Sequence, residues 1–289
     1  MRVLVVSYDP GGAEILSSWV RRNINNQYNY ILGGPAKSIF EKKIKALVNI
    51  DMSNLYSEIK NHNMVITGTS QNSNLEKLAI QIAREENINV VTFLDYWVNF
   101  YNRFELDGDL IYPNEIWVTD EIASQNAKNE LPGSKIILKD NPYIMDLVEQ
   151  KVATNHNDNE MRILYLCQPY NEDGFTDVQG LEYFFILTKL ININKKIRVR
   201  IRLHPLEDTS KYKKLINAYL QFFDIEVSPD NLLVNDLNWS QYVVGMHTNA
   251  LAVAIAFDLK VYFCIPYDKK PCILPHSEIH DYKNIFYGI

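Results

Sequence analysis

Short apolar runs alternate along the chain with longer segments in which apolar residues recur every three or four positions. The short runs are rich in valine, isoleucine and leucine, and glycine, proline, asparagine or aspartate borders most of them. A continuous apolar run of this length predicts a strand that is buried on both faces, as in a parallel sheet. The recurring spacing predicts amphipathic helices that cover such a sheet. The pattern therefore predicts an α/β protein built on parallel sheets.

Two blocks of such segments follow one another, separated by a polar stretch. In the first block we predict strands at 2–8, 28–32, 63–68, 89–94, 115–119 and 135–139, and helices at 15–20, 75–86 and 121–131. In the second block we predict strands at 162–167, 197–203, 226–234, 242–246 and 260–265, and helices at 179–190, 210–223 and 249–257. The polar stretch, residues 146–161, has no apolar periodicity and is interpreted as a linker. We therefore expect domains at 1–145 and 162–289, which suits a chain of 289 residues.

The composition narrows the class of partner. A net charge of −6 and a pI of about 5.6 do not favour nucleic acid, because a phosphate backbone attracts a basic surface. Cys167 and Cys264 fall in apolar runs and no cysteine has metal-ligand spacing, so we expect buried free thiols and a cytoplasmic protein. The first apolar run is too short for a signal peptide, and no run approaches the roughly 18 residues of a membrane span. Any contact with a membrane is therefore expected to be peripheral.

A glycine pair lies between the first predicted strand and the first predicted helix. Gly11 and Gly12 would let a ligand approach the backbone closely, and Glu14 follows them at the start of the helix. The segment has neither the G-x-G-x-x-G spacing nor the lysine of a P-loop, so a dinucleotide or ATP site is not indicated. Two interpretations stay open, a tight strand-to-helix turn and a loop on the acceptor side of an interdomain cleft.

A second candidate loop follows the strand predicted at 89–94. Its candidate acceptor-binding or sugar-binding residues are Asp95, Tyr96, Trp97, Asn99 and Arg103. Aromatic faces pack on the C–H surfaces of a sugar ring, while amides and guanidinium groups bind hydroxyl or carboxylate groups. The loop is therefore interpreted as a sugar platform, with a packed surface corner as the alternative.

Three short polar segments each follow a predicted strand of the second domain. They are Glu172-Asp173-Gly174, His204-Pro205 and His247-Thr248-Asn249. The carboxyl ends of parallel strands lie at one edge of a sheet, and ligands bind at that edge in open α/β folds. We therefore expect the three segments to contribute to one site.

The first two segments supply an acid and an imidazole. Asp173 is a candidate general base, because Gly174 allows a sharp turn and the neighbouring Glu172 would raise its pKa by charge repulsion. An ordinary acidic turn is the alternative. Pro205 holds His204 in an extended conformation, where a protonated imidazole could hydrogen-bond a phosphate or a leaving-group oxygen. A histidine that only caps its strand is the alternative.

The third segment begins a predicted helix. Free N–H groups and the helix dipole favour an anion there, and the side chains of His247, Thr248 and Asn249 add donors. Gly245, just before them, permits a ligand to approach the strand end. An ordinary helix N-cap is the alternative.

The order of these motifs resembles that of bacterial sialyltransferases, over about residues 162–265. The resemblance implies a GT-B fold, in which two Rossmann-like α/β domains face a cleft, and an inverting transfer of a sialic-acid-like nonulosonic acid from a CMP donor. It assigns the base to Asp173, the acid and phosphate partner to His204, and the phosphate-binding hydroxyl to Thr248. That family has two small hydroxyl residues where this chain has His247-Thr248-Asn249, which is a departure in the phosphate site.

The implied reaction is a single displacement at the anomeric carbon. Asp173 would take a proton from the acceptor hydroxyl as CMP leaves, and His204 and Thr248 would stabilise the developing phosphate charge. We expect no metal and no cofactor, with a CMP-sugar as donor and a glycan as acceptor. The first domain resembles proteins of surface-polysaccharide gene clusters, and no residue role follows from that resemblance.

Other interpretations of the same pattern stay open. A UDP-sugar hexosyltransferase or a UDP-sugar 2-epimerase would use the same sheet edge, and a non-catalytic glycan- or nucleotide-binding partner would bind without turnover. The base could also lie in the first domain, at Asp107 or Asp9. The oligomeric state stays open.

Overall fold

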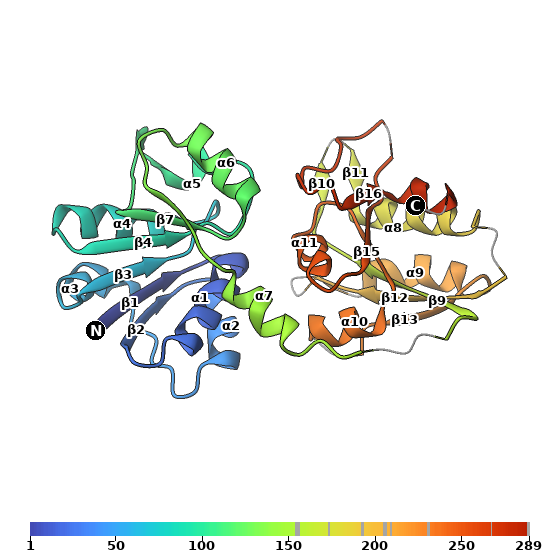
Figure 1. Ribbon diagram of the computed structural model, residues 1–289, viewed down its shortest axis with the longest axis horizontal. Helices are drawn as coiled ribbons and strands as arrows, with labels where there is room; N and C mark the ends of the chain where they lie inside the picture. The colour runs from blue at the N-terminus through green and yellow to red at the C-terminus, as the bar shows by residue number, and fades with distance from the viewer. Residues whose placement is uncertain are drawn as a thin grey trace. The chain divides into compact units, whose positions relative to one another are not determined.

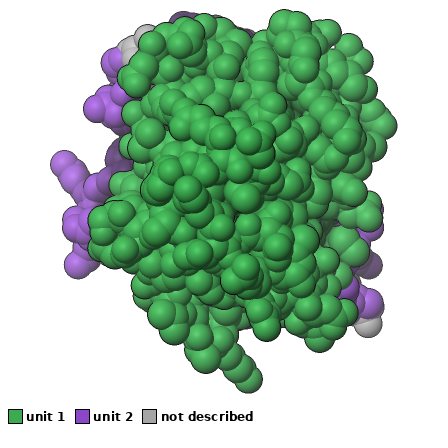
Figure 2. Space-filling view, turned by 90° about the vertical axis from the view of Figure 1, so that its left-hand side faces the viewer, with its two compact units in different colours: residues 1–146 green, residues 147–289 purple. Residues whose placement is uncertain are grey.

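The computed structural model describes two compact units. The described residues are 1–153, 157–172, 174–191, 194–204, 207–208, 210–229, 232–266 and 268–287. One unit is Met1–Asp146 and the other is Leu147–Ile289, coloured separately in Figure 2. Each unit contains one six-stranded sheet with helices around it (Figure 1).

The sheet of unit 1 is entirely parallel, with the order β2-β1-β3-β4-β7-β8. Its strands are β1 (Arg2–Ser7), β2 (Gln27–Leu32), β3 (Met64–Thr67), β4 (Asn89–Phe93), β7 (Glu115–Val118) and β8 (Ile136–Leu138). Its helices are α1 (Pro10–Arg22), α2 (Ala36–Lys43), α3 (Leu55–Lys60), α4 (Leu75–Glu85), α5 (Phe100–Phe104) and α6 (Glu121–Glu130). A short 3-10 helix, Met52–Asn54, and a hairpin of β5 (Glu105–Leu106) and β6 (Asp109–Leu110) complete it.

Both faces of this sheet are buried, which explains the continuous apolar runs of its strands. Val3 and Val5 of β1 pack into one core with α1 and α2. Leu4 and Val6 point the other way and pack with α3, α4 and α6. Side chains of successive strand residues alternate between faces, so each run must be apolar throughout.

The sheet of unit 2 is also parallel, with the order β13-β12-β9-β14-β15-β16. Its strands are β9 (Glu160–Leu166), β12 (Lys196–Arg202), β13 (Asp224–Val227), β14 (Tyr242–Gly245), β15 (Lys260–Phe263) and β16 (Ile279–Asp281). Counted along the chain this is the order 3-2-1-4-5-6 of a Rossmann fold, and the direction of winding reverses between β9 and β14. The prediction of two Rossmann-like α/β domains is confirmed.

The helices of unit 2 cover its sheet. They are α8 (Asp177–Thr188), α9 (Ser210–Tyr219), α10 (Leu233–Trp239) and α11 (Ala250–Ile255), with α7 (Pro142–Val148) at the junction of the units and a 3-10 helix, Tyr282–Tyr287. A two-stranded hairpin, β10 (Asn171–Glu172) and β11 (Phe175–Thr176), precedes α8. Among the described residues, no helix is both long and apolar enough to cross a membrane.

The structure contradicts the strand prediction over 226–234 of unit 2, and it adds β10, β11, β16 and the 3-10 helix, which were not predicted. Short strands were expected over 226–234, but the strand ends at Val227 and Leu233–Trp239 forms α10. Val234 and Leu237 are buried and lie three residues apart, which is helical spacing. The apolar run was too short for periodicity alone to separate a strand from a helix.

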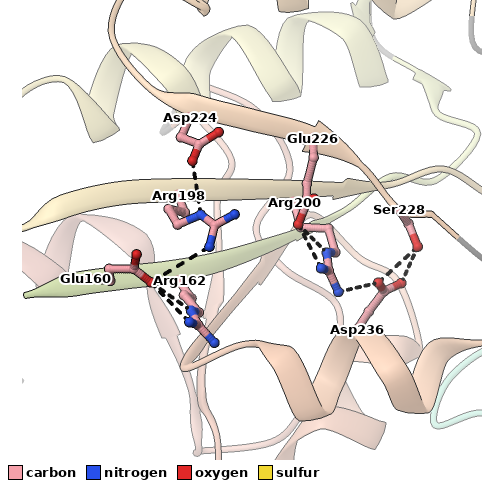
Figure 3. A network of polar contacts seen from close by, with 8 residues as sticks. All are labelled: Glu160, Arg162, Arg198, Arg200, Asp224, Glu226, Ser228 and Asp236. Carbon is pink, nitrogen blue, oxygen red and sulfur yellow. Dashed lines mark hydrogen bonds and ion pairs between the residues drawn. The ribbon is translucent and has the colours of Figure 1, made fainter. Parts of the chain in front are cut away.

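One face of the unit 2 sheet carries a network of charges (Figure 3). Arg200 of β12 pairs with Glu226 of β13 at 2.7 Å and with Asp236 of α10 at 3.3 Å. Arg202 pairs with the same Asp236 at 2.8 Å, and the Ser228 hydroxyl donates to it. Asp236 has no exposed surface, so these hydrogen bonds must replace its hydration. The contacts fasten α10 to the last residues of β12.

At the other end of β12, Arg198 bridges Asp224 at 3.1 Å and Glu160 at 3.8 Å. Arg162 of β9 pairs with Glu160 at 3.1 Å. These carboxylates keep more contact with solvent than Asp236 does. Exposed pairs of this kind add little to stability, so the buried Asp236 is the important member.

We expect Asp236→Ala to lower the free energy of unfolding by about 3–5 kcal/mol, because it removes the buried carboxylate that pairs with the largely buried guanidinium groups of Arg200 and Arg202. Urea unfolding of the purified chain measures the change. Asp224→Ala is the matched control at an exposed pair and should lower stability by less than about 1 kcal/mol. Equal losses for the two variants would contradict the role given to burial.

Candidate functional site at the carboxyl edge of each sheet

The three polar segments of unit 2 follow three adjacent central strands. β9 pairs with β12 on one side and with β14 on the other. Leu166, the last residue of β9, is in register with both Arg202 and Gly245. The strands therefore end at one level, and the loops that follow them leave from the same edge. The reversal of winding between β9 and β14 is where ligands bind in such sheets.

Two residues missed in the sequence connect the loops across this reversal. The backbone N–H of His247 donates to Gln168 Oε1 at 2.8 Å, and the Tyr170 and His247 rings lie 5.3 Å apart. His247 Nδ1 accepts from the N–H of Ile273 at 3.4 Å, so a neutral imidazole carries its proton on Nε2. Gln168 and Tyr170 stand between a buried strand and the acidic segment, and that position was their only signal in the sequence.

His204 lies two residues beyond the end of β12 and is half-buried. Its carbonyl accepts from the N–H of Glu207 at 2.9 Å. Burial, and then the positive charges of Lys211 and Arg202, hold the pKa of His204 below its ordinary value. The imidazole is therefore mainly neutral at pH 7, and it becomes the expected imidazolium only where a bound anion offsets these effects. Asp173 and Pro205 lie outside the residues that the structure describes.

A cluster of polar side chains, in which Lys211 is exposed and the others are largely buried, ties Glu207 to the start of α8. Asp177, the first residue of α8, accepts from both Lys211 Nζ and the Tyr212 hydroxyl. Glu207 accepts from the same two residues, with Tyr212 Oη 2.9 Å away. The segments that follow β9 and β12 are therefore joined by one hydrogen-bonded cluster of side chains.

The pKa values of the two carboxyl groups in this cluster are shifted in opposite directions. Burial opposes the ionisation of Asp177, but the hydrogen bonds from its neighbours outweigh burial and lower its pKa. Burial, together with the hydrogen bond to Asp177, raises the pKa of Glu207. Asp177 is therefore the ionised partner of Lys211, and Glu207 retains its proton to higher pH.

The segment after β14 begins α11. Thr248 Oγ1 accepts from the N–H of Ala250 at 3.4 Å. Asn249 Oδ1 is buried, and no described residue donates to it. A Cβ at Gly245 would lie 3.1 Å from Thr248 Cγ2 and 3.2 Å from the carbonyl oxygen of Leu166. The space at Gly245 is therefore filled by the protein itself.

The glycine pair of unit 1 is likewise used in packing. A Cβ at Gly11 would lie 2.0 Å from Asp95 Oδ2, and one at Gly12 would lie 3.0 Å from the Cα of Gly68. The start of α1 therefore sits directly against the loops after β3 and β4. This is the close approach that the tight-turn interpretation requires, and contact of these glycines with a sugar stays a prediction.

Asp95 and Arg103 form a mostly buried pair at the same edge. Arg103 Nη1 lies 3.0 Å from Asp95 Oδ1 and donates to Thr69 Oγ1 at 2.7 Å, while the Thr69 hydroxyl donates to Asp95 at 2.9 Å. Arg103 also lies over the ring of Tyr96, 5.4 Å from its centroid. Arg103 Nε is buried, and no described residue accepts from it.

The other acceptor-side candidates make contacts of several kinds. Trp97 Nε1 donates to Asp120 at 2.6 Å, and its ring packs against the core. Asn99 is exposed, has a φ of 61° and precedes α5. Glu14 pairs with Lys43 of α2. Trp97 therefore positions the loop, and Asn99 is the candidate most open to a ligand.

Glu76 of α4 is a buried acid that the sequence analysis missed. The N–H of Tyr8 donates to Glu76 Oε1 at 2.6 Å, while Oε2 is buried and no described residue donates to it. Burial raises the pKa of Glu76 to about 8, and the nearby charges of Asp9 and Asp95 act in the same direction. Its only signal in the sequence was its position, next to residues of a predicted helix that were expected to be buried. Glu76 can therefore hold a proton near neutral pH, beside the loop that precedes α1.

The two alternative bases of unit 1 differ in their surroundings. Asp9 precedes α1 and accepts from the N–H of Gln71 at 3.3 Å. Asp107 has a φ of 53° and occupies, with Gly108, the exposed turn of the β5–β6 hairpin. An Asp-Gly pair is a preferred hairpin turn, so the role of Asp107 is accounted for without catalysis. Asp107 and Asp109 form an Asp-x-Asp triplet that the expectation of metal independence overlooked.

Comparisons with known proteins bear on the fold. No protein-family model and no curated protein sequence matches the chain. A putative UDP-N-acetylglucosamine 2-epimerase from Listeria monocytogenes is similar in structure, with a TM-score of 0.64 and 12% identity over 91% of this chain and 79% of that chain. S. aureus MnaA, solved with UDP, has a TM-score of 0.62 and 14% identity over the same shares of the two chains. MurG of Acinetobacter baumannii has a TM-score of 0.57 and 10% identity, over 96% of this chain and 81% of that chain. The chain therefore has the two-domain GT-B type of fold.

We expect Glu76→Gln to change how stability depends on pH. The pKa of Glu76 is about 8 in the folded chain and about 4.3 when unfolded, so its stabilising effect is full below pH 4 and is lost as pH rises to 8. The loss approaches about 1.4 kcal/mol per pH unit between these limits. Glutamine does not titrate and still accepts from Tyr8, so the variant should gain on the wild type as pH rises.

Urea unfolding of wild type and Glu76→Gln at a series of pH values measures this difference. Glu85→Gln, at an exposed position on the same helix, is the matched control and should follow the wild type. Parallel curves for Glu76→Gln and wild type would show that Glu76 does not hold a proton in the folded chain.

Proposed function

We propose that the chain is an enzyme that acts on a nucleotide sugar, whose nucleotide binds at the carboxyl edge of the unit 2 sheet. The observation that carries the proposal is the adjacency of three polar segments on β12, β9 and β14, at the reversal of winding. The imidazole of His204 and the hydroxyl of Thr248 follow adjacent strands at this edge, and these are groups that bind phosphate. The expectation of a nucleotide-sugar enzyme rests on this arrangement together with the GT-B type of fold.

A UDP-sugar is the first candidate ligand. Among solved structures of similar fold, S. aureus MnaA holds UDP, and a UDP-N-acetylglucosamine 2-epimerase from Methanocaldococcus jannaschii holds UDP-N-acetylglucosamine and UDP. These likenesses, with identities of 14% and 16%, support a UDP-sugar 2-epimerase or hexosyltransferase before a CMP-sugar enzyme.

A CMP-sugar transferase is the second candidate. The order of Asp173, His204 and Thr248 resembles that of bacterial sialyltransferases, and the strands that precede these residues are neighbours in the sheet. This candidate predicts a cytidine monophosphate leaving group and a glycan acceptor. The nucleotide that binds therefore separates the two.

The residue roles that we propose are the same for a UDP-sugar and for a CMP-sugar. His204 would donate to the phosphate and gain a proton as the anion binds, because the ligand charge would offset Lys211 and Arg202. Asn249 Oδ1, with no donor among the described residues, would accept from a ligand N–H or O–H. Asp173 would be the base, and Asp95, Arg103 and Glu76 of unit 1 would contact the sugar or acceptor.

We expect UDP or CMP, but not both equally, to raise the melting temperature of the chain. A ligand present at a hundredfold excess over its Kd stabilises the folded state by about 2.7 kcal/mol. Turnover is then followed by NMR with the sugar of the favoured nucleotide, and Asp173→Asn should lower it by about 10²–10⁴-fold with little loss of nucleotide affinity. Asp107→Asn, in the exposed hairpin turn, is the matched control. No shift with any nucleotide would contradict the proposal, and binding without turnover of any donor would favour a non-catalytic partner.

We also expect nucleotide binding to take up a proton at His204. Since the pKa of free His204 is lowered and a bound phosphate would raise it, affinity should increase as pH falls from the pKa of the complex towards that of the free protein. Titration calorimetry in two buffers of different ionisation enthalpy measures the uptake. His204→Gln should bind more weakly and without the linked proton, and His280→Gln, at an exposed position on β16, is the control. The same uptake in wild type and His204→Gln would remove His204 from the phosphate site.

A further inference from the structure

Four large apolar side chains are exposed close together on unit 2. Leu190 is 65% exposed, Leu220 50%, Phe222 48% and Ile186 46%. Ile186 and Leu190 lie four residues apart at the end of α8, and Leu220 and Phe222 follow the end of α9. We call this set, with the neighbouring Lys189, Lys195 and Lys196, the α8–α9 surface.

The two helix ends are neighbours in space (Figure 1). The rings of Phe185 and Tyr219 stack at 4.6 Å, which joins α8 to α9 beneath the surface. Lys189 Nζ lies 3.7 Å from the centroid of the Phe222 ring, so the exposed ends of the two helices touch directly. Lys195 and Lys196 border the same hollow as Leu220 and Phe222. The four apolar side chains therefore belong to one surface.

This surface is basic in a chain that is acidic as a whole. Residues 186–224 contain nine Lys and Arg against three Asp and Glu, a net charge of +6, while the whole chain has −6. Arg200 and Arg202 of this segment are neutralised by Asp236 on the other face of the sheet. Four of its lysines, by contrast, have no carboxylate within ion-pair distance among the described residues: Lys189, Lys195, Lys213 and Lys214.

The acids next to the surface do not cancel this charge. Asp224 is already paired with Lys196 at 3.0 Å and with Arg198 at 3.1 Å. Glu182 lies one helical turn before Ile186, at the border of the surface. Lys189 and Lys195, which lie beside Leu220 and Phe222, therefore leave a positive field around the apolar side chains.

We propose that the α8–α9 surface binds the surface of an anionic phospholipid bilayer. Apolar side chains at helix ends, flanked by lysines, can enter the boundary between headgroups and acyl chains while the lysines stay with the lipid phosphates. The apolar side chains project from helix ends and turns, and a bilayer accepts projecting groups without a matching pocket. Negative lipids attract such lysines, whereas the acidic remainder of the chain would be repelled.

The placement is compatible with the proposed nucleotide site. In a parallel β–α–β arrangement the helices run antiparallel to the strands, so α8 and α9 end at the amino end of the sheet. Lys196 starts β12 at that end, whereas His204 lies just beyond its carboxyl end. Binding of lipid would therefore leave the loops after β9, β12 and β14 uncovered. The proposal does not depend on the chain being a nucleotide-sugar enzyme.

Cosedimentation with vesicles tests the proposal directly on the full chain. We expect wild type to bind vesicles of phosphatidylcholine with phosphatidylglycerol, to bind phosphatidylcholine alone at least tenfold more weakly, and to be released at about 1 M salt, where the Debye length is about 3 Å. The combined change of Lys189 and Lys195 to serine should weaken binding on the order of 25-fold, at about fivefold per lysine. Leu190→Ser with Leu220→Ser should weaken it at least about tenfold.

Two controls separate these effects from misfolding. Lys45→Ser and Val48→Ser change an exposed lysine and an exposed apolar residue of unit 1 and should leave vesicle binding unchanged. Circular dichroism and the melting temperature must match wild type for every variant used, and Ile186→Ser with Leu190→Ser replaces the apolar pair if the first does not fold. No binding to the anionic vesicles, equal binding to neutral vesicles, or binding unchanged in either the lysine or the apolar variant would overturn the proposal. Failure to bind lipid, with binding to an acidic protein instead, would assign the surface to a protein partner.

Discussion

The arrangement of unit 2 depends on the pairing of β9 with two neighbours that come later in the chain. β9 is first in sequence but central in the sheet, between β12 and β14. Parallel pairing aligns the ends of all three strands at Leu166, so the three polar loops must leave from one edge. If β9 lay at the border of the sheet, the same loops would be separated by the width of intervening strands. The site is thus a consequence of strand order before it is a consequence of any single side chain.

Charged groups hold the middle of that edge from both faces of the sheet. On one face Asp236 ties Arg202, at the end of β12, to α10. On the other face Asp177 and Glu207 share Lys211 and Tyr212, which joins the starts of α8 and α9 to the segment that follows β12. Buried charges are tolerated only when they are paired and hydrogen-bonded. These contacts fix the backbone near His204, and the charges of Lys211 and Arg202 add to burial in lowering the pKa of its imidazole.

Unit 1 uses its edge differently. The space beside Gly11 and Gly12 is occupied by Asp95 and Gly68. The start of α1 therefore packs against the protein and does not form an open phosphate-binding loop. The buried side-chain atoms near this edge that have no hydrogen-bond partner among the described residues include Ser7 Oγ, Glu76 Oε2 and Arg103 Nε. Arg103 is already paired with Asp95, and a protonated Glu76 carries no charge, so these groups suit a neutral, hydroxylated ligand better than a polyphosphate. This difference supports the division proposed here, with the nucleotide on unit 2 and the sugar or acceptor on unit 1.

The sequence by itself determined the local features, because these depend on neighbouring residues. Runs buried on both faces were recognised as parallel strands, and the polar residues that end them marked the carboxyl edge, including His204 and His247. The tertiary structure alone decided what depends on distant pairing. It made β9 central, turned Leu233–Trp239 into a helix, and brought Gln168 to His247 and Lys211 to Asp177. It also buried Glu76 and Asp236, whose environments come from strands and loops far along the chain. A charged residue has the same letter in a solvated helix and in a closed core, so only the folded chain shows which of the two it occupies.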